Sequence, residues 1–88
     1  MQTKAISILD RHGVMALATV RPDGWPQATM VSYVNDEFTL YFLISRTSQK
    51  FRNIDADDRV SIAIGTEASE PKSIEGLSMA ACACEVPD

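Results

Sequence analysis

The fold is decided by the stretch "FTLYFLISRTSQKFRN", residues 38–53, in which a strand-like run is followed directly by a basic turn. Residues 38–44 are the most strand-like run of the chain, rich in aromatic and β-branched side chains. The turn is rich in hydroxyl groups and places Arg46, Lys50 and Arg52 within seven positions, although the whole chain is acidic, with 8 Lys and Arg against 12 Asp and Glu. The apolar residues that follow the turn indicate a helix, and the cations lie around the start of that helix.

A helix is predicted directly after the basic turn. Phe51 and Ile54 are three positions apart, which is the spacing of one helical face. The sequence therefore predicts a short helix over residues 47–55. The hydroxyl side chains that could form its N-cap are those of Ser45, Thr47 and Ser48.

The start of this helix has the chemistry of an anion site. Backbone N–H groups in the first turn of a helix lack partners and carry partial positive charge. Together with the hydroxyl groups and the ammonium group of Lys50, they predict a pocket for phosphate. The alternative is a solvated surface helix without a ligand, in which the hydroxyls only cap the helix and carboxylates neutralise the cations. The carboxylates available for this are Asp55, Asp57 and Asp58.

Turn signals divide the upstream residues into two further strands. Short apolar runs cover residues 14–21 and 26–34, and the turn between them, Pro22–Gly24, combines a fixed proline φ with a glycine that accepts positive φ. A second tight turn is predicted at Asn35–Glu37, before the third strand at residues 38–44. The three strands are predicted to form one antiparallel meander.

Further elements flank the meander. Apolar residues at helical spacing predict a helix over residues 3–12, with Gly13 as its C-cap. Alternation of Val and Ile with small residues predicts a half-buried strand over 59–65. A polar connection, residues 66–73, leads to a last apolar stretch, residues 74–86, which is also predicted to be a strand.

The predicted fold is mainly β with short helices, arranged as a small antiparallel barrel in a single domain over residues 1–88. Many short strands separated by turns are typical of such barrels. A barrel of this size needs one more strand, or a neighbouring chain, to close. Because an open sheet edge tends to pair with another chain, we expect a homodimer.

Composition excludes several classes of protein. A net charge of −4 argues against a protein that coats nucleic acid. No stretch approaches the roughly 20 apolar residues of a membrane span, and the charged N-terminus is unlike a secretory signal, so we expect a cytoplasmic protein. No metal site is predicted, because Cys82, Cys84 and the single histidine, His12, do not form a ligand set. The two thiols are expected to be partly buried in a reducing compartment.

Residues 15–64 resemble the pyridoxamine 5′-phosphate oxidase-like family of FMN-binding split-barrel proteins. The resemblance rests on motifs in the family's order: "LATV" before "DG" and Pro26, "LYF" before the Ser, Ser, Lys and Asn of the basic turn, and "DRVS" before Ile64. It implies a split β-barrel, FMN as cofactor and an oxidoreductase-like function. Relatives are typically longer, so the resemblance also implies a form shortened at the C-terminus.

The resemblance also implies which residues bind FMN. In FMN-binding relatives the second strand lies along the flavin ring and the ribityl chain, the end of the third strand continues this contact, and the helix start binds the phosphate. The corresponding residues here are Thr29, Met30, Val31 and Ser32, then Ile44 and Ser45, and finally Ser48, Gln49 and Lys50. The family usually forms homodimers with FMN at the subunit interface. The basic turn would then be the phosphate site.

Three positions depart from the family pattern. Many members have Arg where this chain has Thr29, a basic residue where it has Gln49, and Thr where it has Ile44. Two cationic phosphate contacts are therefore absent at these positions, and each charge-assisted hydrogen bond is worth about 1.5–3 kcal/mol. An alternative function is a non-catalytic dimeric split-barrel module that has lost the cofactor.

No catalytic residue and no substrate are indicated by the sequence. His12 stands alone in the predicted N-terminal helix. Trp25 could cover a flavin or pack across a dimer, but the simpler interpretation is that it packs on its own hairpin. Tyr33, Tyr41 and Phe42 are expected in the core and on the sheet faces, because aromatic residues favour strands.

Overall fold

The computed structural model describes residues 2–65 and 76–86. The elements in these ranges are α1 (Gln2–Arg11), β1 (Val14–Val20), β2 (Pro26–Ser32), β3 (Val34–Asp36), β4 (Thr39–Tyr41), α2 (Gln49–Ala56), β5 (Arg59–Gly65) and β6 (Gly76–Cys82). The predicted connection over residues 66–73 and the first residues of the last predicted strand lie outside the described residues. The prediction of a mainly β, antiparallel fold with short helices is confirmed.

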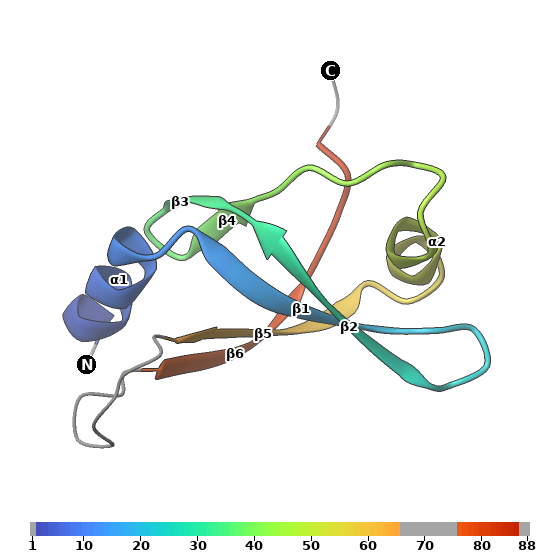
Figure 1. Ribbon diagram of the computed structural model, residues 1–88, viewed down its shortest axis with the longest axis horizontal. Helices are drawn as coiled ribbons and strands as arrows, with labels where there is room; N and C mark the ends of the chain where they lie inside the picture. Colours follow the sequence, from blue (N-terminus) through green and yellow to red (C-terminus); the bar gives the residue numbers. More distant parts are fainter. Residues whose placement is uncertain (1, 66–75, 87–88) are drawn as a thin grey trace.

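Four strands form one twisted antiparallel sheet in the order β2-β1-β5-β6, while β3 and β4 form a separate hairpin. Figure 1 shows α1 and α2 at opposite ends of the molecule, with α2 near the tip of the β1–β2 hairpin. Strand β1 pairs with β2 along its whole length and with β5 on its other side. The central strand therefore fixes the position of the hairpin beside which α2 packs.

The core lies on one face of the sheet. Alternation along β5 buries Val60, Ile62 and Ile64, as predicted, and alternation along β1 buries Met15 and Leu17. Helix α1 contributes Ile8 and Leu9 to the same cluster. Each such side chain gains roughly 1.5–3 kcal/mol on full burial, which is why the period-2 pattern determines the face that turns inward.

The turn between β1 and β2 has the predicted geometry. The N–H of Gly24 donates to the carbonyl of Arg21 at 2.8 Å, and Gly24 adopts a φ of 90°, which a residue with a side chain rarely accepts. Asp23 accepts hydrogen bonds from the N–H of Trp25 at 3.1 Å and from Nη2 of Arg21 at 2.7 Å. The prediction that Trp25 packs on its own hairpin is wrong, because this side chain is 69% exposed.

The predicted meander is wrong in one respect, because the second strand breaks at Tyr33. The N–H of Tyr33 donates to the carbonyl of Gly13 at 2.9 Å, and its hydroxyl donates to the carbonyl of Leu9 at 2.8 Å. The chain beyond it continues as β3, which pairs with β4 instead of extending the main sheet. Gly13 therefore serves as an acceptor for Tyr33, and it lacks the positive φ that is typical of the glycine C-cap predicted there.

The third predicted strand is shorter than expected. It covers only Thr39–Tyr41, and residues 42–45 have no regular secondary structure. The tight turn lies at Glu37 and Phe38 instead of Asn35–Glu37, and Glu37 has a φ of 54°. Residues 42–48 thus form an irregular link between β4 and α2. This link carries the predicted phosphate site.

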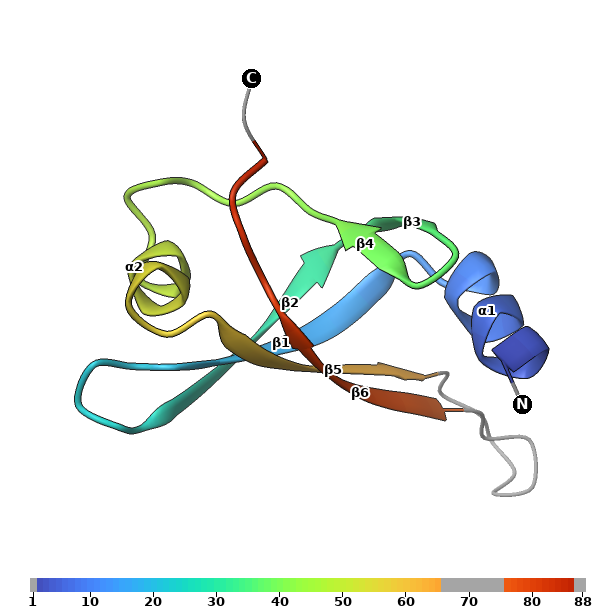
Figure 2. The same ribbon diagram turned by 180° about the vertical axis from the view of Figure 1, so that it is seen from behind.

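The C-terminal segment, residues 83–86, leaves β6 and extends away from the sheet, on the side of the β3–β4 hairpin (Figures 1 and 2). The N–H of Ala83 donates to the carbonyl of Asp58 at 2.8 Å, which fixes the start of this segment. None of the helices in the described ranges is long and apolar enough to cross a membrane.

Candidate functional site

A groove of about 1090 Å³ lies between the end of β2, residues 40–46, the start of α2 and residues 83–86. Most of its lining is apolar, including Met30, Phe42 and Ile54. Polar side chains collect where the link meets α2. They are Ser45, Arg46, Ser48 and Lys50, with Glu85 from the C-terminal segment. The groove therefore has long apolar walls and a polar part that contains cations.

Seven of the nine residues implied as FMN ligands line this groove. They are Met30, Val31, Ser32, Ile44, Ser45, Ser48 and Lys50. They come from strand β2, the irregular link after β4 and the start of α2, which are separated in sequence, so the fold brings them to one surface. Thr29 and Gln49 do not line the groove.

Thr29 carries a buried polar atom that lacks a partner. Its Oγ1 atom is inaccessible to solvent and makes no hydrogen bond within residues 2–65 and 76–86. It lies next to Met30, which lines the groove. A buried hydroxyl left without a partner costs free energy.

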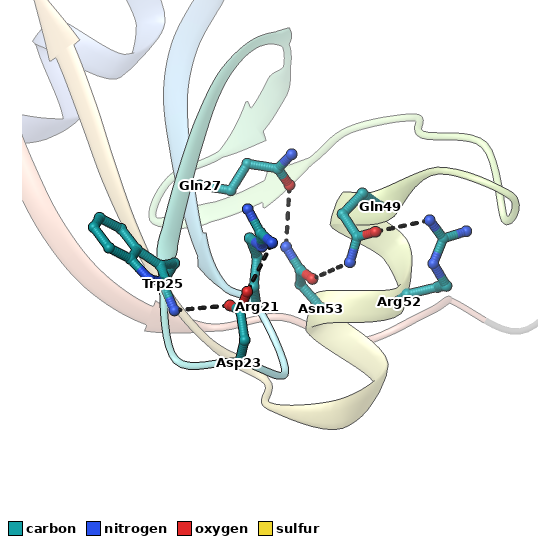
Figure 3. A network of polar contacts seen from close by, with 7 residues as sticks. All are labelled: Arg21, Asp23, Trp25, Gln27, Gln49, Arg52 and Asn53. Carbon is teal, nitrogen blue, oxygen red and sulfur yellow. Dashed lines mark hydrogen bonds and ion pairs between the residues drawn. The ribbon is translucent and has the colours of Figure 1, made fainter.

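Gln49 is turned away from the groove by its hydrogen bonds. Its Nε2 atom donates to Oδ1 of Asn53 at 2.8 Å, and its Oε1 atom accepts from Nη2 of Arg52 at 2.8 Å (Figure 3). Gln49 therefore keeps its partners within α2. The next residue, Lys50, lines the groove instead.

Ser48 is the N-cap of α2, which identifies it among the three possible caps. It has extended backbone geometry, and its Oγ atom accepts from the N–H of Phe51 at 3.2 Å and donates to the carbonyl of Ser45 at 2.6 Å. The predicted helix over residues 47–55 is thus shifted, since α2 covers Gln49–Ala56. Within the part of the chain that the structure describes, the N–H groups of Gln49 and Lys50 have no acceptor.

The hydroxyl groups of Ser45 and Thr47 share one hydrogen bond of 2.7 Å. Ser45 Oγ also accepts from the N–H of Thr47 at 3.2 Å. Because either hydroxyl can be the donor in the shared bond, one hydroxyl hydrogen of this pair is left for another acceptor. The hydroxyls thus shape the turn and retain one donor.

The three cations of the basic turn have different surroundings. Arg46 forms an ion pair with Glu85 that joins two walls of the groove. Arg52 donates from Nη1 to the carbonyl of Thr47 at 2.8 Å and from Nη2 to Gln49. Lys50 is half-buried and has no hydrogen bond or ion pair with the described residues. Lys50 is therefore the cation of this turn that is available to an anion.

The alternative in which Asp55, Asp57 and Asp58 neutralise the basic turn is not supported by the observed contacts. Asp57 pairs instead with Arg59, which donates to it from Nε at 3.0 Å and from Nη2 at 2.8 Å. These hydrogen bonds lower the pKa of Asp57 to about 2. Asp57 is therefore a partner of β5 and not of the basic turn.

Sequence reasoning missed the apolar rim of the groove. Large side chains that line it are strongly exposed, including Leu43 at 98%, Val34 at 68% and Met30 at 67%. A contiguous apolar surface of this kind marks a site of ligand or protein contact. The signal in the sequence was a run of large apolar residues that continues past the end of β4.

The cysteines and the histidine contribute little to this site. Cys82 and Cys84 are both exposed, so the prediction that they are partly buried is wrong, and only Cys84 lines the groove. His12 follows α1 and is not part of the lining. No group of three His, Cys, Asp or Glu side chains in the described ranges could hold a metal ion.

Several solved structures are similar to this chain. A FAD-binding protein from Mesorhizobium loti has a TM-score of 0.87 and 20% identity, with 100% of this chain and 63% of that protein covered. An F420 reductase has a TM-score of 0.68 and 33% identity, with 82% and 56% covered. HutZ, a heme storage protein from Vibrio cholerae, has a TM-score of 0.82 and 22% identity, with 98% and 63% covered. The chain thus spans less than two thirds of the length of each.

A comparison with curated proteins found no match. A family model described as pyridoxamine 5′-phosphate oxidase, in contrast, matches residues 1–88. The match covers the whole chain and includes both the strands and the helix start that form the groove. The fold, the groove and this match lead to one conclusion: the chain belongs to the pyridoxamine 5′-phosphate oxidase family.

Proposed function

We propose that this chain binds FMN in the groove, with the phosphate at the start of α2 and the ring system along the apolar walls. The observation that carries the proposal is the donor set at that point. The ammonium group of Lys50 and the N–H groups of Gln49 and Lys50 have no partner among the described residues. A helix N-terminus with a nearby cation is a common binding site for phosphate.

The size and chemistry of the groove fit this ligand. Sites for small molecules and cofactors typically have volumes of roughly 300–1,000 Å³, mostly apolar walls and a few fixed polar groups. The groove has about 1090 Å³ and the same distribution of polarity. The remaining hydroxyl hydrogen of Ser45 or Thr47 is a further group that a ligand would satisfy.

In such a site FMN supplies the redox chemistry of its ring. The chain's own residues hold the phosphate, contact the ring and keep water from the apolar part of the groove. No side chain in the lining stands out as a general acid or base. We therefore propose an FMN-dependent oxidoreductase whose substrate is not specified by the groove.

Two of the similar solved structures, the F420 reductase and the heme storage protein, suggest F420 and heme as two other cofactors to test. Heme iron is commonly held by His, Cys, Met or Tyr. The single histidine, His12, does not line the groove, but Met30, Tyr41 and Cys84 do, together with the phosphate donors at the start of α2. We favour a phosphate-bearing flavin over heme because of these phosphate donors.

We further propose that the site lies at a homodimer interface. The support is the exposed apolar rim, which would be unusual on a monomer. The alternative, a dimeric module without cofactor, is favoured by one observation: Arg46 is already paired with Glu85, which leaves Lys50 as the unpaired cation of the turn. Titration with FMN distinguishes the two.

The test is fluorescence titration of purified protein with FMN, with Lys50→Ala as the variant and Lys4→Ala as its control. Loss of a charge-assisted hydrogen bond worth about 1.5–3 kcal/mol predicts an affinity that is about 10- to 100-fold weaker for Lys50→Ala. Lys4 is exposed on α1, so its variant should bind like the wild type. If the wild-type protein does not bind FMN, the result would instead support the alternative of a dimeric module without a cofactor.

A further inference from the structure

Asn53 is a fully buried polar residue in α2, with 0% exposure. Its Nδ2 atom donates to Oγ1 of Thr19 at 2.9 Å and to Oε1 of Gln27 at 3.0 Å. Its Oδ1 atom accepts from Nε2 of Gln49 at 2.8 Å. Figure 3 shows the side chain of Asn53 between Gln27 of β2 and Gln49 of its own helix.

The two strand partners of Asn53 are themselves a pair. Thr19 of β1 and Gln27 of β2 lie directly opposite each other in the ladder of this hairpin. One amide group thus ties α2 to both strands of the hairpin at a single level. Thr19 is buried too, at 2% exposure, so water does not compete strongly for these bonds.

From Asn53 the hydrogen bonds continue to the start of the helix. Gln49 accepts from Nη2 of Arg52, and Nη1 of Arg52 donates to the carbonyl of Thr47. The network therefore reaches from the β1–β2 hairpin to the turn that precedes α2. Neither Asn53 nor Thr19 lines the groove, so both act on the groove only through other residues.

The network also fixes the rotation of α2 about its axis. Successive residues of a helix point about 100° apart. With Gln49 held toward Asn53, the next side chain, Lys50, is directed into the groove. A rotation of α2 would move Lys50 and the two unpartnered N–H groups together.

We propose that Asn53 is the positioning residue for the phosphate site. It sets the position and rotation of α2 on the β1–β2 hairpin, so that Lys50 and the first N–H groups of the helix face the groove. The inference rests on the proposed binding of FMN. Its specific consequence is that Asn53 controls the part of the affinity that comes from the phosphate.

The ratio of riboflavin to FMN dissociation constants isolates this part, because the two ligands differ only in the phosphate. We expect Asn53→Leu to lower this ratio at least tenfold, toward the value for Lys50→Ala, while the affinity for riboflavin changes less than twofold. Ile62→Val, a core variant on β5, should lower the urea midpoint and leave the ratio unchanged. A purely structural role of Asn53 would lower stability without changing the ratio.

Two variants at Thr19 provide a second test that survives if Asn53→Leu does not fold. Thr19→Val keeps the shape of the side chain and removes the acceptor for Asn53, and it should lower the ratio. Thr19→Ser keeps the hydroxyl and should retain the wild-type ratio. Equal ratios for wild type, Thr19→Val and any folded Asn53→Leu would overturn the positioning role, whereas a wild type that binds neither ligand would overturn the proposed function itself.

Discussion

At the scale of single residues, the two threonines that face the inner side of the β1–β2 hairpin are in opposite states. Thr19 has its hydroxyl hydrogen-bonded to Asn53, whereas the hydroxyl of Thr29 has no partner among the described residues. An unpartnered buried hydroxyl costs about 1–3 kcal/mol.

Thr29→Val is therefore expected to stabilise the ligand-free protein, by about 1 kcal/mol in the free energy of unfolding. Because Thr29 does not line the groove, the variant should bind FMN like the wild type. Urea unfolding with and without FMN measures both effects. The matched control is Thr19→Val, which removes a hydroxyl that has a partner and should destabilise the protein. Destabilisation by Thr29→Val without FMN would contradict this argument.

Residue patterns allowed some of these roles to be predicted. Gly24 was recognisable because a glycine that follows Pro22 and Asp23 is typical of a turn position with positive φ. Ser48 was among the expected caps because hydroxyls precede helices. The burial of Asn53 was not predictable, since a polar residue in a short helix is usually solvated and its partners are 26 and 34 positions away.

At the scale of elements, both ends of α2 are fixed by capping hydrogen bonds, from Ser48 at its start and from Asp57 at its end. The N–H of Asp57 donates to the carbonyl of Asn53 at 2.8 Å, and the carboxylate of Asp57 accepts from the N–H and the guanidinium of Arg59, the first residue of β5. The hydrogen bonds to Arg59 lower the pKa of Asp57 from 3.8 to about 2. The helix is therefore joined to the next strand by hydrogen bonds to the carboxylate of Asp57.

This lowered pKa gives a pH prediction with a definite sign. Because the folded pKa of Asp57 lies below its unfolded value, its contribution to stability is present above about pH 4 and is lost as the pH falls toward 2. Asp57→Asn should therefore show a smaller loss of stability between pH 5 and pH 2 than the wild type, measured by urea midpoints. Since Arg59 is exposed, the difference is expected to be modest.

Arg59→Gln is the companion variant, because it removes the cation that lowers the pKa. It should flatten the same part of the pH profile, and the double variant should add nothing further. An unchanged profile for both single variants would show that the ion pair does not contribute to folding.

The predicted boundaries of the elements agree with the observed ones only where no contact with a distant residue ends the element. Strand β5 was predicted correctly because Val60, Ile62 and Ile64 alternate and all face the core. The second strand was predicted too long because hydrogen bonds from Tyr33 to Gly13 and Leu9 end it. Such contacts depend on the packing of α1 and cannot be read from the residues around Tyr33.

At the scale of the whole molecule, the chain has an open form. Its radius of gyration is 13.8 Å, whereas a compact domain of this length has about 12 Å. Seven of the residues that line the groove were predictable, because the family resemblance assigns them from two short stretches of sequence, residues 29–32 and 44–50. The apolar rim was not, because the sequence does not tell whether Leu43 or Val34 meets its own core, a ligand or a second chain.

The open form and the rim lead to a prediction about assembly. We expect a dimer in solution in which Leu43, 98% exposed on the single chain, is buried. Burial of a leucine side chain is worth about 1.5–3 kcal/mol, and a two-fold interface contains it twice. Leu43→Lys should therefore weaken dimerisation by about 10²- to 10⁴-fold in sedimentation equilibrium, and FMN binding should weaken with it.

The control for this experiment is Ser7→Lys, which adds the same charge at an exposed position of α1, outside the groove lining. It should sediment like the wild type. If the wild-type protein is monomeric at tens of micromolar, the rim is not a dimer interface. If the wild type is a dimer and Leu43→Lys stays dimeric while its FMN affinity falls, Leu43 contacts the cofactor from within its own chain. The mass and the FMN affinity of Leu43→Lys thus distinguish two roles of the apolar rim, contact with a second chain and contact with the cofactor.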